Sequence, residues 1–139
     1  MKEALAKILE EGVVPVIRVA SAQEAFEVAK AIHDGGISVI EVTMTVPGAM
    51  DVIKEVSQKF GKKVLLGAGT VLDPETARAA LINGAQFLVS PSLNLDVIKM
   101  SSRYSAVVIP GALTPTEILT AWEAGADLVM GNHTHVVQA

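Results

Sequence analysis

Six short apolar runs, rich in β-branched residues, recur along the chain at regular intervals. They begin near Val13, Ile37, Val64, Gln86, Ala106 and Asp127. Successive runs therefore start 20 to 27 residues apart, which leaves room for one helix between each pair of strands. Parallel strands require such long crossover connections, whereas antiparallel strands do not. The spacing predicts an α/β fold with a parallel sheet.

The segments between these runs carry signals for helix ends. Ser21 and Thr114 each stand three residues before a glutamate, as in a capping box. Asp73 precedes a proline in a typical N-cap position, and Asn94 is placed to cap the helix that follows it. Three predicted helices end in small turns that contain glycine, at 34–36, 83–85 and 124–126.

The composition limits the possible functions of the chain. Its 139 residues suffice for one domain, and 50% of them are hydrophobic, which suits a parallel sheet covered by helices. The net charge of −4 gives no electrostatic reason to expect nucleic acid as a partner. The absence of cysteine excludes disulfides and zinc thiolate sites. Without a signal peptide or a membrane-spanning run, we expect a cytoplasmic protein with no membrane partner.

Several of the predicted strands end in polar residues, and Glu41 is the most informative of them. A strand covered on both faces buries its side chains, and a buried carboxylate is costly without a partner. One interpretation is a structural salt bridge with Arg18, at the exit of the neighbouring strand. The other is a carboxyl group that serves as an acid and a base. Thr70 follows the next strand, and because Asp73 already provides the helix cap, we expect Thr70 to contact a ligand.

Further candidates for ligand contact lie at the same predicted edge. Thr43 continues the strand of Glu41, and Ser90 and Pro91 follow the fourth strand. The sequence Gly67-Ala-Gly69 lacks the third glycine of a dinucleotide-binding turn. We interpret its glycines as small residues that let the chain turn at the rim of a barrel.

Five segments together resemble one known family, the 2-keto-3-deoxy-6-phosphogluconate / 4-hydroxy-2-oxoglutarate aldolases. They are Gly12–Arg18, Gly36–Thr43, Gly67–Val71, Gly84–Pro91 and Ile109–Glu117. The resemblance implies a TIM-type (β/α)8 barrel without a cofactor, usually assembled as a homotrimer. It implies a lyase of carbohydrate metabolism, of the Entner–Doudoroff type. Such an enzyme cleaves a 2-keto-4-hydroxy acid to pyruvate and an aldehyde through a lysine Schiff base.

The resemblance also implies roles for individual residues. Glu41 matches the general acid and base of the family, and Arg18 and Thr70 match residues that hold the carboxylate of pyruvate. Thr43, Ser90 and Pro91 are not assigned a role by the resemblance and stay candidates for further contacts to this small keto acid. The position of the Schiff-base lysine is occupied by Met130, and a thioether cannot form an imine.

The chain departs from the family pattern in its last part. We expect a single domain over 1–139, with an aldolase-like part over 1–129, a divergent tail over 130–139, and strands seven and eight of the barrel absent. The tail resembles a histidine motif of metallophosphoesterases, in which His133 and His135 would face the same side of a strand. Three functions remain open: an aldolase that has lost activity at Met130, a remnant that binds a keto acid or itself, and a metal-dependent enzyme using His133 and His135.

Overall fold

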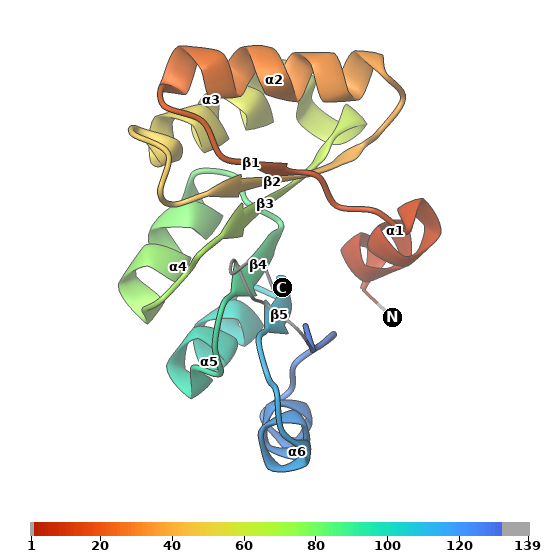
Figure 1. Cartoon of the computed structure of the whole chain (residues 1–139), viewed down its shortest axis with the longest axis vertical. Coiled ribbons are helices and arrows are strands. Elements are labelled where there is room, and N and C mark those ends of the chain that lie inside the picture. Colours follow the sequence, from red (N-terminus) through yellow and green to blue (C-terminus); the bar gives the residue numbers. More distant parts are fainter. Residues whose placement is uncertain (1, 132–139) are drawn as a thin grey trace, which may run out of the picture.

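The computed structural model describes residues 2–131, in which five strands form one parallel sheet (Figure 1). Along the sheet the strands follow their order in the sequence, so each strand pairs with the one before it. They are β1 (Val16–Ile17), β2 (Val39–Thr43), β3 (Leu65–Gly69), β4 (Phe87–Ser90) and β5 (Val107–Pro110). Sequential order with helical crossovers is the arrangement of a barrel-type sheet rather than a doubly wound one.

Helices cover both faces of this sheet. Five of them each follow a strand and pack on one face, whereas the first helix lies apart from them, on the other side of the sheet (Figure 1). The helices are α1 (Glu3–Glu11), α2 (Ala22–Asp34), α3 (Ala49–Phe60), α4 (Pro74–Ile82), α5 (Leu95–Arg103) and α6 (Pro115–Glu123). A 3-10 turn, η1 (Gly61–Lys63), links α3 to β3.

The alternation of side chains along each strand divides the core into two clusters. On β2, Ile40 and Val42 pack toward α2–α6, in the larger cluster. Val39 points the other way and meets Leu65, Phe87 and the α1 residue Ile8 in a smaller inner cluster. The face toward α1 corresponds to the interior of a barrel, and Glu41 and Thr43 share it with Val39 because they alternate in the same phase.

The helix caps and helix-ending glycines predicted from the sequence are confirmed. The side chains of Ser21, Asp73 and Thr114 each accept a hydrogen bond from the backbone N–H three residues later. Asn94 accepts from Asp96 and Val97 at the start of α5. Gly36, Gly84 and Gly125 all have positive φ after their helices, which explains why glycine stands at these turns.

The expected α/β class with a parallel, TIM-like sheet is confirmed, although the two outer runs contribute less than expected. β1 has only two residues, because Pro15 directly before it has no N–H for the ladder. The run from Asp127 forms no full strand within the described residues. It joins β5 through one bridge, Gly111 to Met130, and through the Met130 N–H, which donates to the Pro110 carbonyl at 2.9 Å.

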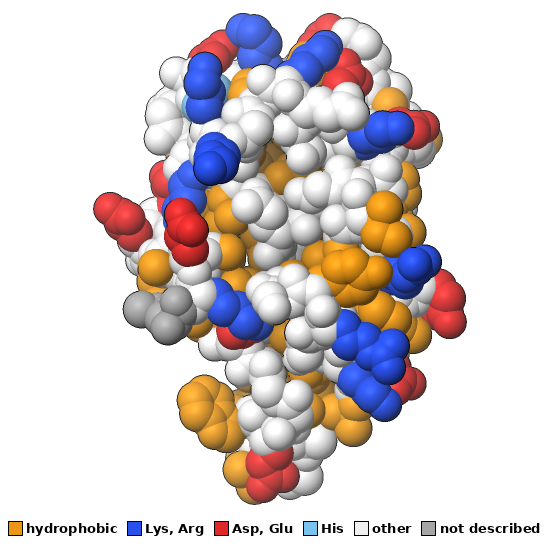
Figure 2. All heavy atoms as spheres, turned by 180° about the vertical axis from the view of Figure 1, so that it is seen from behind, with side chains coloured by type: hydrophobic (Ala, Val, Ile, Leu, Met, Phe, Trp, Pro, Cys, Tyr) orange, Lys and Arg blue, Asp and Glu red, His pale blue; other side chains and the backbone are white. Residues whose placement is uncertain are grey.

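The surface differs between the two ends of the molecule. Charged side chains cluster at the end that carries α2 and α3, whereas hydrophobic side chains reach the surface in the half that carries α5 and α6 (Figure 2). Leu113, Leu119 and Trp122 are the most exposed of the large hydrophobic side chains in that half. None of the helices between residues 2 and 131 is long and apolar enough to cross a bilayer.

Candidate active site

Glu41 lies in the middle of β2 and points to the inner face of the sheet. In the sheet, Glu41 pairs with Val16 of β1 on one side and with Gly67 of β3 on the other. Only 7% of its surface is exposed, so most of the water around its carboxyl group is removed. An ionised carboxylate is destabilised in such a place, and this gives Glu41 an unusual proton affinity.

Burial raises the pKa of the Glu41 carboxyl to about 7, and the positive charge of Arg18 partly opposes this shift. A group with that pKa exists in both protonation states at neutral pH, as a general acid and base requires. Arg18 is exposed and follows β1 directly. Within residues 2–131 the ion pairs are Lys2–Asp127, Lys30–Asp34 and Lys59–Glu55. The direct salt bridge between Arg18 and Glu41 is therefore not formed, and Arg18 acts through its charge at longer range.

Thr70 directly follows β3 and has a left-handed backbone, with φ of 57°. A β-branched residue is rarely found there, and such conformations tend to occur at functional sites. Asp73 caps α4 by accepting from the N–H of Thr76 at 2.6 Å, as the sequence indicated. The Thr70 hydroxyl is consequently not required for the start of the helix.

The other predicted contact residues lie at the same edge, but they differ in how exposed they are and in whether their hydroxyl groups are already hydrogen-bonded. Thr43 is fully buried, and its hydroxyl is hydrogen-bonded to that of Thr45. Ser90 is also buried, and its hydroxyl has no partner among the described residues. Pro91 is half-buried and lines a hollow of about 110 Å³ together with Gly111 and Met130.

Met130 lies on the opposite side of this edge from Glu41. Its side chain packs against the inner cluster, which contains Val89 and Val107. Glu41 and Met130 thus belong to the same inner face, although they stand on different elements. The thioether cannot act as a nucleophile toward a ketone.

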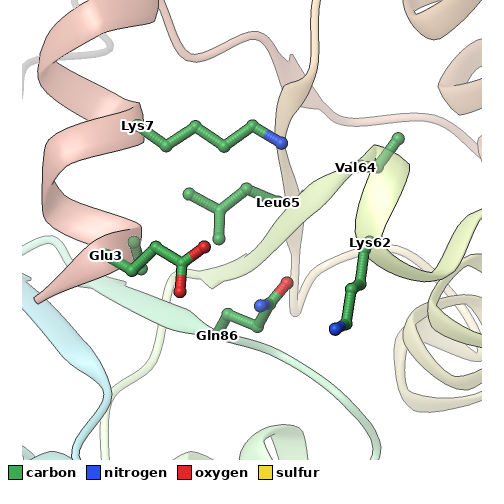
Figure 3. A pocket seen from close by; sticks show the side chains of 7 residues that line it. Glu3, Lys7, Lys62, Val64, Leu65 and Gln86 are labelled. Atoms are coloured by element: carbon green, nitrogen blue, oxygen red, sulfur yellow. The ribbon is translucent and has the colours of Figure 1, made fainter.

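A larger hollow, of about 210 Å³, lies at the other end of the strands (Figure 3). Lys7 from α1 and Lys62 from η1 line it together with Gln86, which precedes β4. Because these residues precede the strands whereas Thr70 and Pro91 follow them, the hollow is separate from the Glu41 site. Lys7 and Lys62 are therefore not placed to replace the lysine that is absent at position 130.

Two predicted metal ligands, His133 and His135, lie outside the described residues. Within the described range, no three His, Cys, Asp or Glu side chains come together as a metal site.

The sequence interpretation of Gly67 and Gly69 as residues of a rim turn is wrong, because both lie inside β3. A side chain on Gly69 would overlap the Glu41 carboxyl, and one on Gly67 would overlap the ring of Phe87. The two glycines are therefore part of the site. The sequence contained one sign of this role. Gly67 and Gly69 are two residues apart, so on a strand they face the same side, and their strand follows the one that carries Glu41.

The chain matches one known protein family. The family model described as "Aldolase: KDPG and KHG aldolase" matches residues 5–130. The 2-dehydro-3-deoxy-phosphogluconate aldolase of Treponema pallidum (strain Nichols) is 39% identical over 117 residues, which cover 84% of this chain and 55% of that protein. The KHG/KDPG aldolase of Escherichia coli (strain K12) is 35% identical over 125 residues, which cover 89% of this chain and 58% of that protein. The chain thus spans a little over half the length of these relatives.

A solved structure agrees with the sequence relatives. The KDPG aldolase from Legionella pneumophila, with pyruvate captured as a covalent carbinolamine intermediate, superposes with a TM-score of 0.82 at 28% identity. The superposition covers 91% of this chain and 61% of that one. The arrangement of strands and helices described above is therefore that of the matching part of this aldolase.

Proposed function

The chain belongs to the KDPG and KHG aldolase family, and on that premise we propose that it binds a pyruvate-type 2-keto acid at the carboxyl end of its sheet. The observation that carries the proposal is the buried Glu41, whose pKa is raised to about 7. The family consists of carbon–carbon lyases, and the reaction we propose for this site is the cleavage of a 2-keto-4-hydroxy acid to pyruvate and an aldehyde.

Binding comes first in this proposal. The charge of Arg18 attracts the carboxylate of the keto acid, and the Thr70 hydroxyl fixes its orientation by a hydrogen bond. Arg18 is exposed and Thr70 is half-buried, so both are accessible from solvent. Pro91 lines the hollow at the same edge and is proposed as a further contact. Ser90 is in phase with Leu88 of the larger, outer cluster and its hydroxyl is buried, so it is not among the proposed contacts.

Proton transfer is the proposed role of Glu41. As a carboxylate it takes the proton from the C4 hydroxyl, the C3–C4 bond breaks, and the aldehyde leaves. The protonated Glu41 then returns the proton to C3, which gives pyruvate. A pKa of about 7 suits both steps at neutral pH.

The covalent step of the family is the part that this chain lacks. A lysine at position 130 would form an imine that accepts the electrons of the breaking bond, but Met130 cannot do so. The electrons would instead have to pass to the keto oxygen itself. We therefore propose that the site retains keto-acid binding and proton transfer, and that turnover is lower by several orders of magnitude than in a lysine-containing relative.

Calorimetric titration with pyruvate between pH 5 and 9 tests this function, and Arg18→Gln is the informative variant. We expect measurable binding to the wild-type chain and a weakening of about tenfold or more in the variant, the loss of one charge-assisted contact. Arg103→Gln, at the end of α5, removes a charge elsewhere and should bind as the wild type does. Absence of pyruvate binding to the wild-type chain at every pH would refute the proposal.

We also propose that the protein works as a homo-oligomer, with the trimer of the family resemblance as the expected form. Leu119 and Trp122 are exposed and stand three residues apart on α6, so they share one face of that helix, and this apolar pair supports self-association. Sedimentation velocity would decide this, and a monomer at micromolar concentration would contradict it.

A further inference from the structure

We propose that Gly69 is a positioning residue, whose missing side chain makes the seat that holds the Glu41 carboxyl group on the inner face of β3. The role assigned to Glu41 rests on the proposed function, but the seat itself is a property of the unliganded fold. No residue other than glycine fits at position 69 while Glu41 keeps its place.

The register of the sheet shows how Glu41 reaches this seat. Glu41 stands directly opposite Gly67, and Thr43 stands opposite Gly69. The Glu41 side chain therefore extends diagonally, by two residues along β3, toward the carboxyl end of the sheet. Side chains in strands commonly lean along the strand, and diagonal neighbours are within reach of a long side chain.

The contact itself is close. A Cβ atom on Gly69 would overlap Oε1 of Glu41 and would lie 2.5 Å from its Cδ and 3.0 Å from its Cγ. The carboxyl group thus rests on the backbone of Gly69, at the position that a side chain would otherwise fill. Glycine is typical of places where another group must approach the backbone closely.

The neighbouring inward position of β3 is filled in the same way by an apolar group. A Cβ atom on Gly67 would overlap the ring of Phe87, which is fully buried on β4. Two groups from the flanking strands therefore occupy the bare inner face of β3, the ring over Gly67 and the carboxyl over Gly69. Water has little access to a carboxyl held in this way, which agrees with its small exposed surface.

The consequence of a side chain at position 69 follows from which atoms it would meet. The blocked atoms form the end of a flexible side chain rather than backbone, so Glu41 can swing away and β3 can remain in place. In Gly69→Ala the carboxyl should move outward into water and recover an ordinary proton affinity. The fold should survive, but the acid and base group should be misplaced.

Carbon-13 NMR titration of the Glu41 carboxyl in the unliganded full chain tests this inference, with the signal assigned by its loss in Glu41→Gln. We expect Gly69→Ala to lower the pKa of Glu41 by about one unit or more. Gly67→Ala is the matched control, since it adds the same methyl group to the same face and meets Phe87 instead. It should shift the Glu41 pKa less. An unchanged pKa in Gly69→Ala, or an equal shift in Gly67→Ala, would overturn the proposal.

Unfolding in urea provides a second measurement that does not depend on the titration. Gly69→Ala should lower the midpoint of unfolding in the wild-type background and should lower it much less in a Glu41→Ala background, because the overlapping atoms are then gone. Equal losses in both backgrounds would show that Gly69 serves the strand and not Glu41. Neither measurement uses pyruvate, so a failure of pyruvate binding would refute the proposed function and leave this inference standing.

Discussion

The two sides of the carboxyl edge of the sheet differ in the groups that they turn to the interior. On the side of β2 and β3, a buried carboxyl rests on a glycine backbone, with Arg18 and the strained Thr70 at the strand exits. On the side of β5, Met130 packs against apolar side chains. In the proposed function, keto-acid binding and proton transfer therefore depend on other strands than the covalent step does. Groups on different strands can be kept or lost independently, because each is held by its own local packing.

Among the variants that test this difference between the two sides, Met130→Lys should have the largest effect, because it should restore covalent binding of pyruvate. A lysine at this inward position would be partly desolvated, which lowers its pKa and frees the amine for attack on a ketone. Incubation with pyruvate and borohydride, followed by mass spectrometry, should change from no adduct in the wild type to a stable adduct in the variant.

Leu128→Lys is the control for this gain of a covalent bond. Leu128 packs against the same inner cluster as Met130 but lies two residues earlier in the chain, farther from the carboxyl edge. It should form little adduct. Equal yields of adduct in both variants would show that a lysine at position 130 is no better placed to reach the bound keto acid than one at position 128. Met130 would then not account for the difference between the two sides of the edge.

The buried carboxyl should make stability depend on pH, and the sign follows from its raised pKa. The pKa of Glu41 is about 7 in the folded chain and near 4.5 when unfolded, so the folded state holds the proton more tightly. The contribution of Glu41 to stability is therefore fully present below pH 4.5 and is lost as the pH rises through about 7. The upper limit of the loss is about 3 kcal/mol, from 1.36 kcal/mol per pKa unit.

Urea unfolding of wild type and Glu41→Gln between pH 4 and 8 measures this effect. The amide cannot ionise, so the variant should lack this fall and should be the more stable protein at pH 8. Asp73 and Glu117, whose pKa values are lowered by hydrogen bonds, contribute equally to both proteins and cancel in the difference. A difference in stability that does not change with pH would mean that the Glu41 carboxyl is not destabilised by burial.

The sequence predicted the α/β fold and the helix caps well because these depend on local signals. Ser21, Asp73 and Thr114 act within one helical turn, so no tertiary information is needed to place them. Glu41 was recognisable because a carboxylate inside an apolar strand is unusual. The contact of Gly69 with Glu41 depends on the register between β2 and β3, which the amino-acid pattern alone does not fix.

Two further expectations, the Arg18–Glu41 salt bridge and the strand from Asp127, also failed because they depend on tertiary contacts. The partnership of Arg18 with Glu41 was inferred from neighbouring strand exits, but a long side chain at a strand exit can turn to water instead. The run from Asp127 has the composition of a strand, yet it joins β5 through a single bridge within the described residues. Composition describes the preference of a segment, whereas pairing also depends on what lies beside it.

Thr70→Gly is expected to have the smallest effect on the fold while still separating structure from function on the β3 side. Glycine accepts φ of 57° without strain, and this gain of roughly 1 kcal/mol offsets its greater conformational freedom when unfolded. The midpoint of urea unfolding should therefore stay the same or rise. Affinity for pyruvate should fall by about tenfold, because the hydroxyl that we propose orients the carboxylate is gone.

Ser105→Gly is the matched control for this change. Ser105 has nearly the same backbone, with φ of 54°, but lies in the turn between α5 and β5, at the end of the sheet away from Glu41. Its stability should respond as that of Thr70→Gly does, while pyruvate affinity stays at the wild-type value. If Thr70→Gly kept full affinity, the strain at Thr70 would have no connection with ligand binding. The proposed binding of the keto acid would then depend on Arg18 and not on Thr70.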